Sequence, residues 1–394
     1  MKLLHTLNNT KIGIIGGGQL GKMMAIEGKK LGLRFIILDP QPDCPASSVV
    51  DEQIVGDFFD DEKIKALADK TDIITYEFEH IYADLLIHLI EEGYRVYPSP
   101  EALKIIQDKY HQKEFLTKKG IEAPEFREIK GIEDIYRAID DMGLPLLLKS
   151  RRGGYDGKGN YLIKTEDEVQ TAYEMLGGDE KLLMVEAFVD FRMEISAIVA
   201  RGAGGEQKIY PLSENIHENN ILKTTIAPAR VSDEIAQKAK SVAEEVVEVL
   251  DGVGVFCIEM FVDKNEKVLI NEIAPRVHNS GHYTFEGCYT SQFEQHLRAI
   301  LGLPLGSTEL IKPSVMINLL GEDNYTGNAK IIGAEKLLEI PAAYLHFYGK
   351  NISKPQRKMG HITVLDSDIE KAMEKAEKAR GLVRVIGEEA IIND

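Results

Sequence analysis

One stretch near the N-terminus reads KIGIIGGGQLG over residues 11–21 and decides the fold class of the first part of the chain. The β-branched run Lys11–Ile15 predicts a short buried strand, the glycines predict a tight turn, and the apolar-periodic residues through Leu31 predict a helix. Two further strand patterns follow at Phe35–Leu38 and Asp72–Tyr76. This alternation is typical of a parallel sheet with covering helices.

The glycine turn of this stretch also matches a dinucleotide-binding pattern. Gly16, Gly18 and Gly21 fall on G-x-G-x-x-G, and Asp39 ends the next strand, where an acid would bind a ribose. Such glycines let a phosphate approach the backbone, and the helix N-terminus attracts its charge. Two interpretations stay open, a nicotinamide-dependent oxidoreductase or an ordinary strand-to-helix turn of a doubly wound sheet. An oxidoreductase would leave the motifs of the middle of the chain without a role.

The composition is that of an ordinary globular protein. The chain has 394 residues, 44% of them apolar, which suggests two to four domains. Its 64 acidic and 47 basic residues give a net charge of −17, which argues against non-specific nucleic-acid binding. No apolar run is long enough for a membrane span, and residues 1–10 lack the core of a signal peptide. Cys44, Cys257 and Cys288 form no C-x-x-C pair, so we expect a reducing cytoplasm without disulfides or structural zinc.

A glycine-rich loop in the middle of the chain is the next candidate site. Residues 151–160 hold four glycines, two arginines and one lysine between the strand patterns Leu144–Lys149 and Tyr161–Lys164. Such a loop offers backbone N–H donors and suits a lid over phosphates. Its alternative is a polar hairpin loop. Lys149 would reach into the same space, unless it is simply a strand-end charge that extends into water.

Two carboxylates and an amide indicate a metal site. Glu259 lies in the strand pattern Val253–Val262, and Asn271 and Glu272 lie in the pattern Lys267–Ile273, so an antiparallel pair is expected. Oxygen ligands of this kind hold Mg²⁺ against nucleotide phosphates. The alternative is surface charge on two strands, but Glu259 lies in an apolar run and needs a partner.

Two further clusters follow. The loop of residues 274–282 contains Arg276, His278, Asn279 and His282 directly after the metal candidates, which favours a functional site. Lys350 and Arg357 form, with Lys358 and His361, a basic cluster that would bind a phosphate monoester or else be a solvated loop.

The remaining patterns complete the expected elements. A single helix is expected from about Glu101 to Lys119, where Gly120 ends it. Thr165 and Glu168 form a capping-box pattern that opens another helix. Further strands and helices are expected at 182–186, 193–200, 233–250, after Ser291, and at 368–379.

The order of these parts resembles the ATP-grasp superfamily. The superfamily places ATP between two α+β subdomains, and its parts are matched here by Lys149, the glycine-rich loop, Glu186-Ala187-Phe188-Val189, and Glu259 with Asn271-Glu272. The resemblance implies that the backbone of 187–189 reads the adenine edge and that Glu194 binds the ribose hydroxyls.

Within the superfamily, five motifs resemble the N5-carboxyaminoimidazole ribonucleotide synthetase family: residues 16–21 (GGGQLG), 77–79 (EFE), 152–159 (RGGYDGKG), 214–217 (ENIH) and 271–282 (NEIAPRVHNSGH). Lys109 stands where many members carry arginine, and Asn160 where glutamine is usual. The resemblance implies an α/β and α+β protein in three parts: a Rossmann-like domain over 1–103, an ATP-grasp domain over 104–312 with a lid subdomain at about 120–190, and a small, mostly β domain over 313–394.

The resemblance also implies a reaction. ATP phosphorylates bicarbonate to give carboxyphosphate and ADP, and the carboxyl group passes to the amine of 5-aminoimidazole ribonucleotide, a step of purine (IMP) biosynthesis. The cofactors are ATP and Mg²⁺, the remaining partners are small molecules, and the protein is a cytoplasmic homodimer. A sister ATP-grasp ligase that joins formate to glycinamide ribonucleotide is the alternative, and the motifs at 155–157 and 275–282 favour the first.

The residues that the resemblance assigns fall into three groups. ATP binding is assigned to Lys109, Lys149, Gly154, Tyr155, Asp156, Gly157, Lys158, Gly159, Asn160, Glu186, Ala187, Phe188, Val189, Glu194, His217, Asn271 and Glu272. The metal ligands are Glu259 and Glu272. The acceptor substrate and its chemistry are assigned to Glu77, Tyr155, Asp156, Lys158, Arg276, His278, Lys350 and Arg357, of which the last two would hold the 5′-phosphate.

Overall fold

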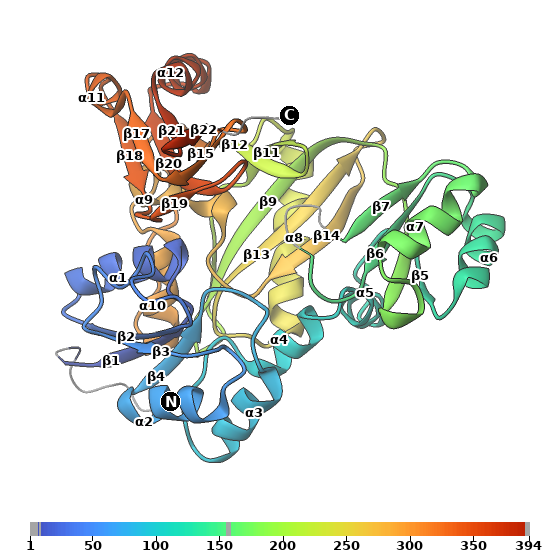
Figure 1. Ribbon diagram of the computed structural model, residues 1–394, viewed down its shortest axis with the longest axis horizontal. Coiled ribbons are helices and arrows are strands. Elements are labelled where there is room, and N and C mark those ends of the chain that lie inside the picture. Colours follow the sequence, from blue (N-terminus) through green and yellow to red (C-terminus); the bar gives the residue numbers. More distant parts are fainter. Residues whose placement is uncertain (1–6, 8, 155–158, 391–394) are drawn as a thin grey trace.

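The computed structural model describes residue 7 and residues 9–154 and 159–390 (Figure 1). The N-terminal region is a four-stranded parallel sheet in the order β3-β2-β1-β4. Its strands are β1 (Lys11–Ile15), β2 (Arg34–Asp39), β3 (Glu52–Val55) and β4 (Ile73–Tyr76), and its helices are α1 (Gln19–Lys30), α2 (Asp61–Lys70), α3 (Ala83–Glu91) and α4 (Pro100–Ile106). The apolar runs of β1, β2 and β4 are buried, as expected for strands covered on both faces.

A second sheet forms a separate lobe to the right of Figure 1. It is antiparallel, in the order β5-β8-β6-β7, and it carries α6 and α7. The elements are β5 (Phe126–Ile129), α6 (Ile132–Met142), β6 (Leu146–Ser150), β7 (Asn160–Ile163), η1 (Glu166–Glu168), α7 (Val169–Met175), η2 (Gly178–Glu180) and β8 (Leu183–Ala187). The capping box of Thr165 and Glu168 is confirmed. We call β5–β8 with α6 and α7 the lid lobe.

A large antiparallel sheet joins the centre of the molecule to its C-terminal part. Its order is β14-β13-β9-β11-β12-β15-β20-β18, with β10 beside β9. Ala227 of β12 pairs with Ser314 of β15, so the C-terminal strands extend the same sheet. The strands are β9 (Phe191–Arg201), β10 (Gln207–Ile209), β11 (Ser213–Glu218), β12 (Ile221–Ala227), β13 (Gly254–Asp263), β14 (Val268–Ala274), β15 (Ser314–Leu320), β18 (Ala343–Phe347) and β20 (Lys358–Leu365).

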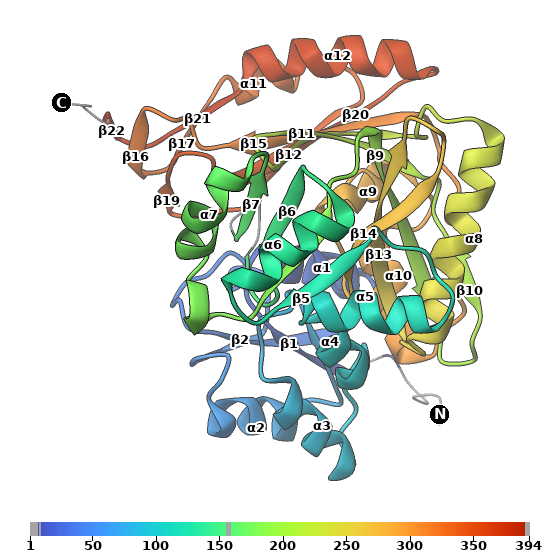
Figure 2. The same cartoon turned by 90° about the vertical axis from the view of Figure 1, so that its right-hand side faces the viewer.

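Helices cover both parts of this sheet. Helix α8 packs on the central strands, and α12 packs across β15 and β20 at the top of Figure 2. Helix α10 lies against both α1 and β13, which joins the first sheet to the large one in one apolar core. The remaining elements are α5 (Lys109–Lys118), α8 (Asp233–Val249), η3 (Asn279–Gly281), α9 (Thr284–Gly287), α10 (Gln292–Leu301), β16 (Tyr325–Asn328), β17 (Lys330–Ile332), α11 (Ala334–Leu337), β19 (Ile352–Ser353), α12 (Ile369–Leu382), β21 (Arg384–Ile386) and β22 (Glu389–Ala390).

The single helix expected over 101–119 is wrong. The structure has two helices, α4 and α5, separated at Gln107 and Asp108. Asp108 has an extended backbone, and its carboxylate accepts hydrogen bonds from the N–H groups of Tyr110 (3.1 Å) and His111 (3.2 Å). An aspartate that caps a helix N-terminus satisfies donors that a continuous helix would pair internally, so the capping preference of Asp108 overrides the helical periodicity. The end before Gly120, which has φ +84°, is as expected.

Among the described residues, no helix combines the length and apolarity that crossing a membrane requires. The three cysteines are free and buried.

Candidate active site

The glycine turn after β1 is filled by the chain's own carboxylates. Glu77, at the end of β4, accepts hydrogen bonds from the backbone N–H groups of Gly18 and Gly21, the second at 2.6 Å. Asp39 accepts one from Gly17 at 2.8 Å. A Cβ on Gly18 would lie 2.6 Å from a Glu77 oxygen, so glycine is required for this approach. The donors that a dinucleotide phosphate would use are therefore already paired, which removes the basis for the oxidoreductase interpretation.

A group of charged side chains from distant segments surrounds Glu77. Burial raises the pKa of Glu77, while the Gly21 and Gly18 N–H groups and the positive charge of Lys350 favour its charged form. Arg276 forms an ion pair with Glu79 at 2.8 Å, and this carboxylate raises the pKa of the half-buried Arg276 against the effect of burial. The C-terminal loop is tied to α1 by a hydrogen bond of 2.9 Å from Lys22 Nζ to the Tyr348 carbonyl. Glu77, Arg276 and Lys350 thus come together although they belong to three parts of the chain.

The basic side chains of the C-terminal cluster form hydrogen bonds with backbone carbonyls of their own region. Lys350 Nζ donates to the carbonyl of Lys358 at 2.7 Å, and Arg357 Nη1 donates to the carbonyl of Ile352 at 2.6 Å. Burial lowers the pKa of Arg357, whose guanidinium is therefore partly removed from water. This placement differs from a fully solvated basic loop.

A cavity of about 530 Å³ lies between the lid lobe and the turn that joins β13 to β14. Ala187, Phe188 and Val189, which follow β8, line one side of it, and residues 263–265, Lys267 and Leu269 line the other. The expected adenine hinge therefore faces a cavity. Backbone N–H and C=O groups beside apolar side chains are the usual means of binding a flat heterocycle.

Next to this cavity, two lysines share one buried carboxylate. Glu186 Oε2 lies 3.0 Å from Lys113 Nζ and 3.3 Å from Lys149 Nζ. Burial alone would raise the pKa of Glu186, but the charges of Lys113 and Lys149 lower it below its usual value. The cluster carries one more positive than negative charge in a buried position, so it is suited to bind a polyanion such as a triphosphate.

The two predicted metal ligands lie directly opposite each other. Glu259 of β13 pairs in register with Glu272 of β14. Burial and then the negative charge of Glu272 raise the pKa of Glu259 to about 7. The ammonium of Lys109, 2.7 Å from the half-exposed Glu272, lowers the pKa of Glu272. Asn271 is the unpaired residue of a β-bulge here, a feature that re-aims side chains near active sites. Among the described residues, no lysine or arginine forms an ion pair with Glu259, although the positive charges of His217 and Lys358 act on it from farther away.

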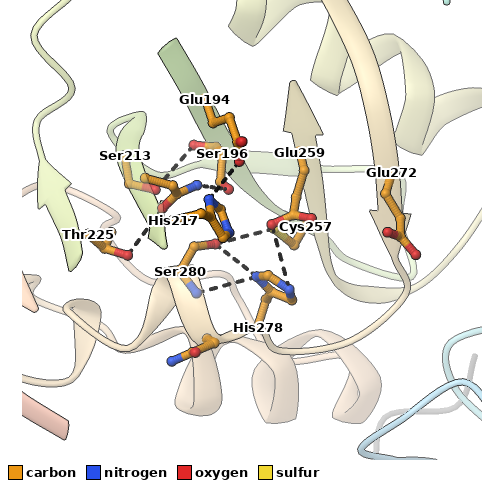
Figure 3. A network of polar contacts seen from close by, with 12 residues as sticks. Glu194, Ser196, Ser213, His217, Thr225, Cys257, Glu259, Glu272, His278 and Ser280 are labelled. Atoms are coloured by element: carbon orange, nitrogen blue, oxygen red, sulfur yellow. Dashed lines mark hydrogen bonds and ion pairs between the residues drawn. The ribbon is translucent and has the colours of Figure 1, made fainter. Parts of the chain in front are cut away.

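Two histidines face Glu259 from the other side (Figure 3). His217 Nδ1 lies 2.6 Å from Glu194, and this carboxylate raises the pKa of His217 against the effect of burial. His278 Nδ1 accepts from the Ser280 N–H at 3.3 Å and lies 2.9 Å from Ser280 Oγ, while Nε2 is 3.9 Å from Glu259. Burial and then the charge of Arg276 hold the pKa of His278 well below its usual value, so His278 is neutral at pH 7.

The glycine-rich loop connects β6 and β7, which pair as an antiparallel hairpin with Lys149 opposite Asn160. Gly153, Gly154 and Gly159 have φ of +72°, +76° and +91°. Residues with a side chain rarely adopt such positive φ values, so these three glycines allow the backbone conformation of the loop. Tyr155, Asp156, Gly157 and Lys158 lie outside the described residues.

Two residues of this region, Lys113 and Asp108, are not among the site residues predicted from the sequence. Lys113 lies four residues after Lys109 and therefore on the same face of α5. This spacing alone could have indicated that both lysines belong to the site. The sequence could have indicated Asp108 only as a helix cap. Its ion pair with the buried Arg151 is visible only in the folded chain.

Comparisons with known proteins agree with this geometry. Three domain families match consecutive parts of the chain: the ribonucleotide synthetase preATP-grasp domain over residues 9–107, the ATP-grasp domain over 114–293, and the phosphoribosylaminoimidazole carboxylase C-terminal domain over 314–375. The chain is 44% identical over 354 residues to the N5-carboxyaminoimidazole ribonucleotide synthase of Bacillus subtilis. The aligned residues make up 90% of this chain and 91% of that relative. The chain belongs to the N5-carboxyaminoimidazole ribonucleotide synthase family.

Solved members of the N5-carboxyaminoimidazole ribonucleotide synthase family have the same fold. The synthetase from Thermotoga maritima is 49% identical, with a TM-score of 0.88 over 96% of this chain and 100% of the other. The synthase from Aspergillus clavatus, solved with ADP and 5-aminoimidazole ribonucleotide, is 36% identical, with a TM-score of 0.87 over 96% of this chain and 99% of the other. The fold classes expected from the sequence are confirmed.

Proposed function

We propose that this protein joins bicarbonate to 5-aminoimidazole ribonucleotide at the expense of ATP, giving N5-carboxyaminoimidazole ribonucleotide, ADP and phosphate. The observation that supports this proposal is that the folded chain contains two groups of site residues, one suited to a nucleotide and one to the acceptor, which we call the nucleotide half-site and the acceptor half-site. One holds the hinge cavity with the lysines and carboxylates around Glu272, and the other holds Glu77, Arg276 and Lys350.

The nucleotide half-site would bind ATP along the lid lobe. The backbone of 187–189 lines the cavity and would take the adenine edge, and Glu194 would bind the ribose hydroxyls. Lys149 and Lys113, held by Glu186, and Lys109, held by Glu272, supply positive charge for the phosphates. The glycine-rich loop would close over them and keep water from carboxyphosphate.

Glu259 and Glu272 fit Mg²⁺. They offer carboxylate oxygens from directly opposite positions, and burial and the negative charge of Glu272, which raise the pKa of Glu259, would be offset by a bound cation. When bound, the ion would neutralise charge that develops on the transferred phosphoryl group.

The acceptor half-site would hold the ribonucleotide. Lys350 and Arg357 would bind its 5′-phosphate, and Glu77 would lie beside the aminoimidazole. A bicarbonate oxygen would attack the γ-phosphorus in line with the departing ADP oxygen, while Arg276 and Lys109 stabilise the negative charge on the reacting oxygens. Neutral His278 is able to donate a hydrogen bond from Nε2 toward the same space.

The test measures ADP release with bicarbonate present or absent and with each acceptor. Release that needs both bicarbonate and 5-aminoimidazole ribonucleotide, together with transfer of labelled carbon from bicarbonate to the product, supports the proposal. Formate-dependent release with glycinamide ribonucleotide would instead identify a sister ligase. We further propose that the enzyme is a cytoplasmic homodimer, which light scattering after size exclusion and cell fractionation would check.

A further inference from the structure

Three side chains of different chemical types meet at one corner of the site in Figure 3. Cys257 Sγ, a carboxylate oxygen of Glu259 and a ring nitrogen of His278 all lie within 4.8 Å of one another. Cys257 and Glu259 are two residues apart on β13, so both point to the same face of the sheet. His278 reaches them from the loop after β14. Among residues 9–154 and 159–390 no other group of metal-ligating side chains is as close.

Ser280 connects two of these groups. Its Oγ lies 2.9 Å from His278 Nδ1 and 3.5 Å from Cys257 Sγ. If Nε2 of His278 binds a cation, its proton moves to Nδ1 and is donated to Ser280 Oγ, at the expense of the 3.3 Å bond from the Ser280 N–H. The Ser280 hydroxyl then donates to the sulfur. A hydrogen-bonding partner behind each ligand is usual in protein metal sites.

We propose that Cys257, Glu259 and His278 bind a thiophilic divalent cation such as Zn²⁺ or Cd²⁺. Zn²⁺ prefers sulfur and nitrogen ligands in tetrahedral sites, whereas Mg²⁺ takes oxygen ligands, so the sulfur selects between them. Cys257 is fully buried, but the side chains of Glu259 and His278 are 23% and 17% exposed. The cation therefore enters from the Glu259 side and keeps an open coordination position.

Binding releases the Cys257 thiol proton, because the cation replaces it on sulfur, and also any proton that the Glu259 carboxyl still carries at the pH of the experiment. Glu259 is shared with the proposed Mg²⁺ site, so the thiophilic cation competes with Mg²⁺ and inhibits ATP turnover. Only the inhibition rests on the proposed function. Binding itself depends on the three side chains alone.

The first experiment titrates Cd²⁺ into the nucleotide-free protein and records the ultraviolet charge-transfer absorption of a cadmium thiolate. We expect one equivalent to give the band in the wild type and in Cys288→Ser, a control at another buried cysteine, and no band in Cys257→Ser. A wild type without the band, or a Cys257→Ser variant that keeps it, overturns the proposal.

The second experiment measures Zn²⁺ inhibition of ADP formation at fixed Mg²⁺. Cys257→Ser should need at least about tenfold more Zn²⁺ for half inhibition, while its activity without Zn²⁺ stays within about twofold of the wild type. Equal inhibition of both proteins contradicts the competition. If Cys257→Ser unfolds, Ser280→Ala keeps the thiol and should weaken Cd²⁺ binding by about 10–100-fold. An unchanged Cd²⁺ affinity in that variant overturns the proposal. A protein without ATP turnover disproves the proposed function and leaves the absorption titration to decide the site.

Discussion

The Arg151 guanidinium makes a bidentate pair with the Asp108 carboxylate, with Nε to Oδ1 at 3.0 Å and Nη2 to Oδ2 at 2.8 Å. Both side chains are buried, at 5% and 1% exposure, and the Arg151 carbonyl accepts the N–H of Lys109 at 2.8 Å. Arg151 is the first residue of the glycine-rich loop, directly after β6, and Asp108 caps α5, which carries Lys109 and Lys113. The pair therefore ties the root of the loop to the helix that carries two site lysines.

Arg151→Met should destabilise the protein strongly. It leaves Asp108 as a buried charge without its main partner, which costs about 3–5 kcal/mol. Removing both charges in Asp108→Asn with Arg151→Met should cost less than the two single changes added, as urea unfolding in a double-mutant cycle would measure. Arg127→Met, at an exposed ion pair, is the control and should change stability little. Additive single changes would mean that the pair is not coupled.

Glu272→Gln should abolish ADP formation and leave folding nearly intact. The amide removes a metal oxygen and the partner of Lys109, a loss of several kcal/mol in the transition state. Steady-state ADP release and thermal unfolding are the two measurements. Glu122→Gln, at an exposed position, serves as the control. Near-normal turnover in Glu272→Gln would remove the metal assignment.

Mg²⁺ binding should strengthen as the pH rises through about 7. The pKa of Glu259 is raised to about 7, first by burial and then by Glu272, so the folded protein holds a proton there that the unfolded chain has already lost. In the absence of metal, this group therefore makes the protein less stable as the pH rises from about 4.5 to 7. Mg²⁺ should offset that loss.

The thermal shift caused by Mg²⁺, measured at pH 6 and pH 8, checks this prediction. We expect a larger shift at pH 8, and a small and pH-independent shift in Glu259→Gln. The same shift at both pH values in the wild type would exclude Glu259 as a titrating ligand.

Arg357→Ala should raise the KM for the acceptor and leave the KM for ATP nearly unchanged. A charge-assisted hydrogen bond to the 5′-phosphate is worth about 1.5–3 kcal/mol, so the KM for 5-aminoimidazole ribonucleotide should rise by about tenfold to a hundredfold. The KM for ATP should change little, because lost uniform binding raises the KM of the ligand that loses the contact. Arg384→Ala, on the exposed side of the same region, should change neither constant. A rise in the KM for ATP alone would move Arg357 to the nucleotide site.

The sequence by itself determined the elements whose signals are local. The apolar run of β1, the capping box of Thr165 and the paired strands β13 and β14 all follow from short-range periodicity and turn residues, and the structure confirms them. The pairing of the two strands also brings Glu259 near Glu272, but the register of the rest of the hairpin would place Asn271 opposite Glu259. The β-bulge at Asn271, which only the structure shows, sets Glu272 there instead. The sequence does not predict the break at Asp108, because a helical period and a helix cap compete there. The buried contact with Arg151 adds to the local preference for the cap.

The tertiary structure alone decided the contacts between distant segments. Glu77 fills a glycine turn 59 residues before it, Lys113 of α5 forms an ion pair with Glu186 of β8, and β12 pairs with β15 to extend one sheet into the C-terminal region. Each depends on how whole elements pack and in which register strands pair. A backbone preference at one residue carries no information about a partner that lies far along the chain, so these contacts are visible only once the core that holds the elements together has formed.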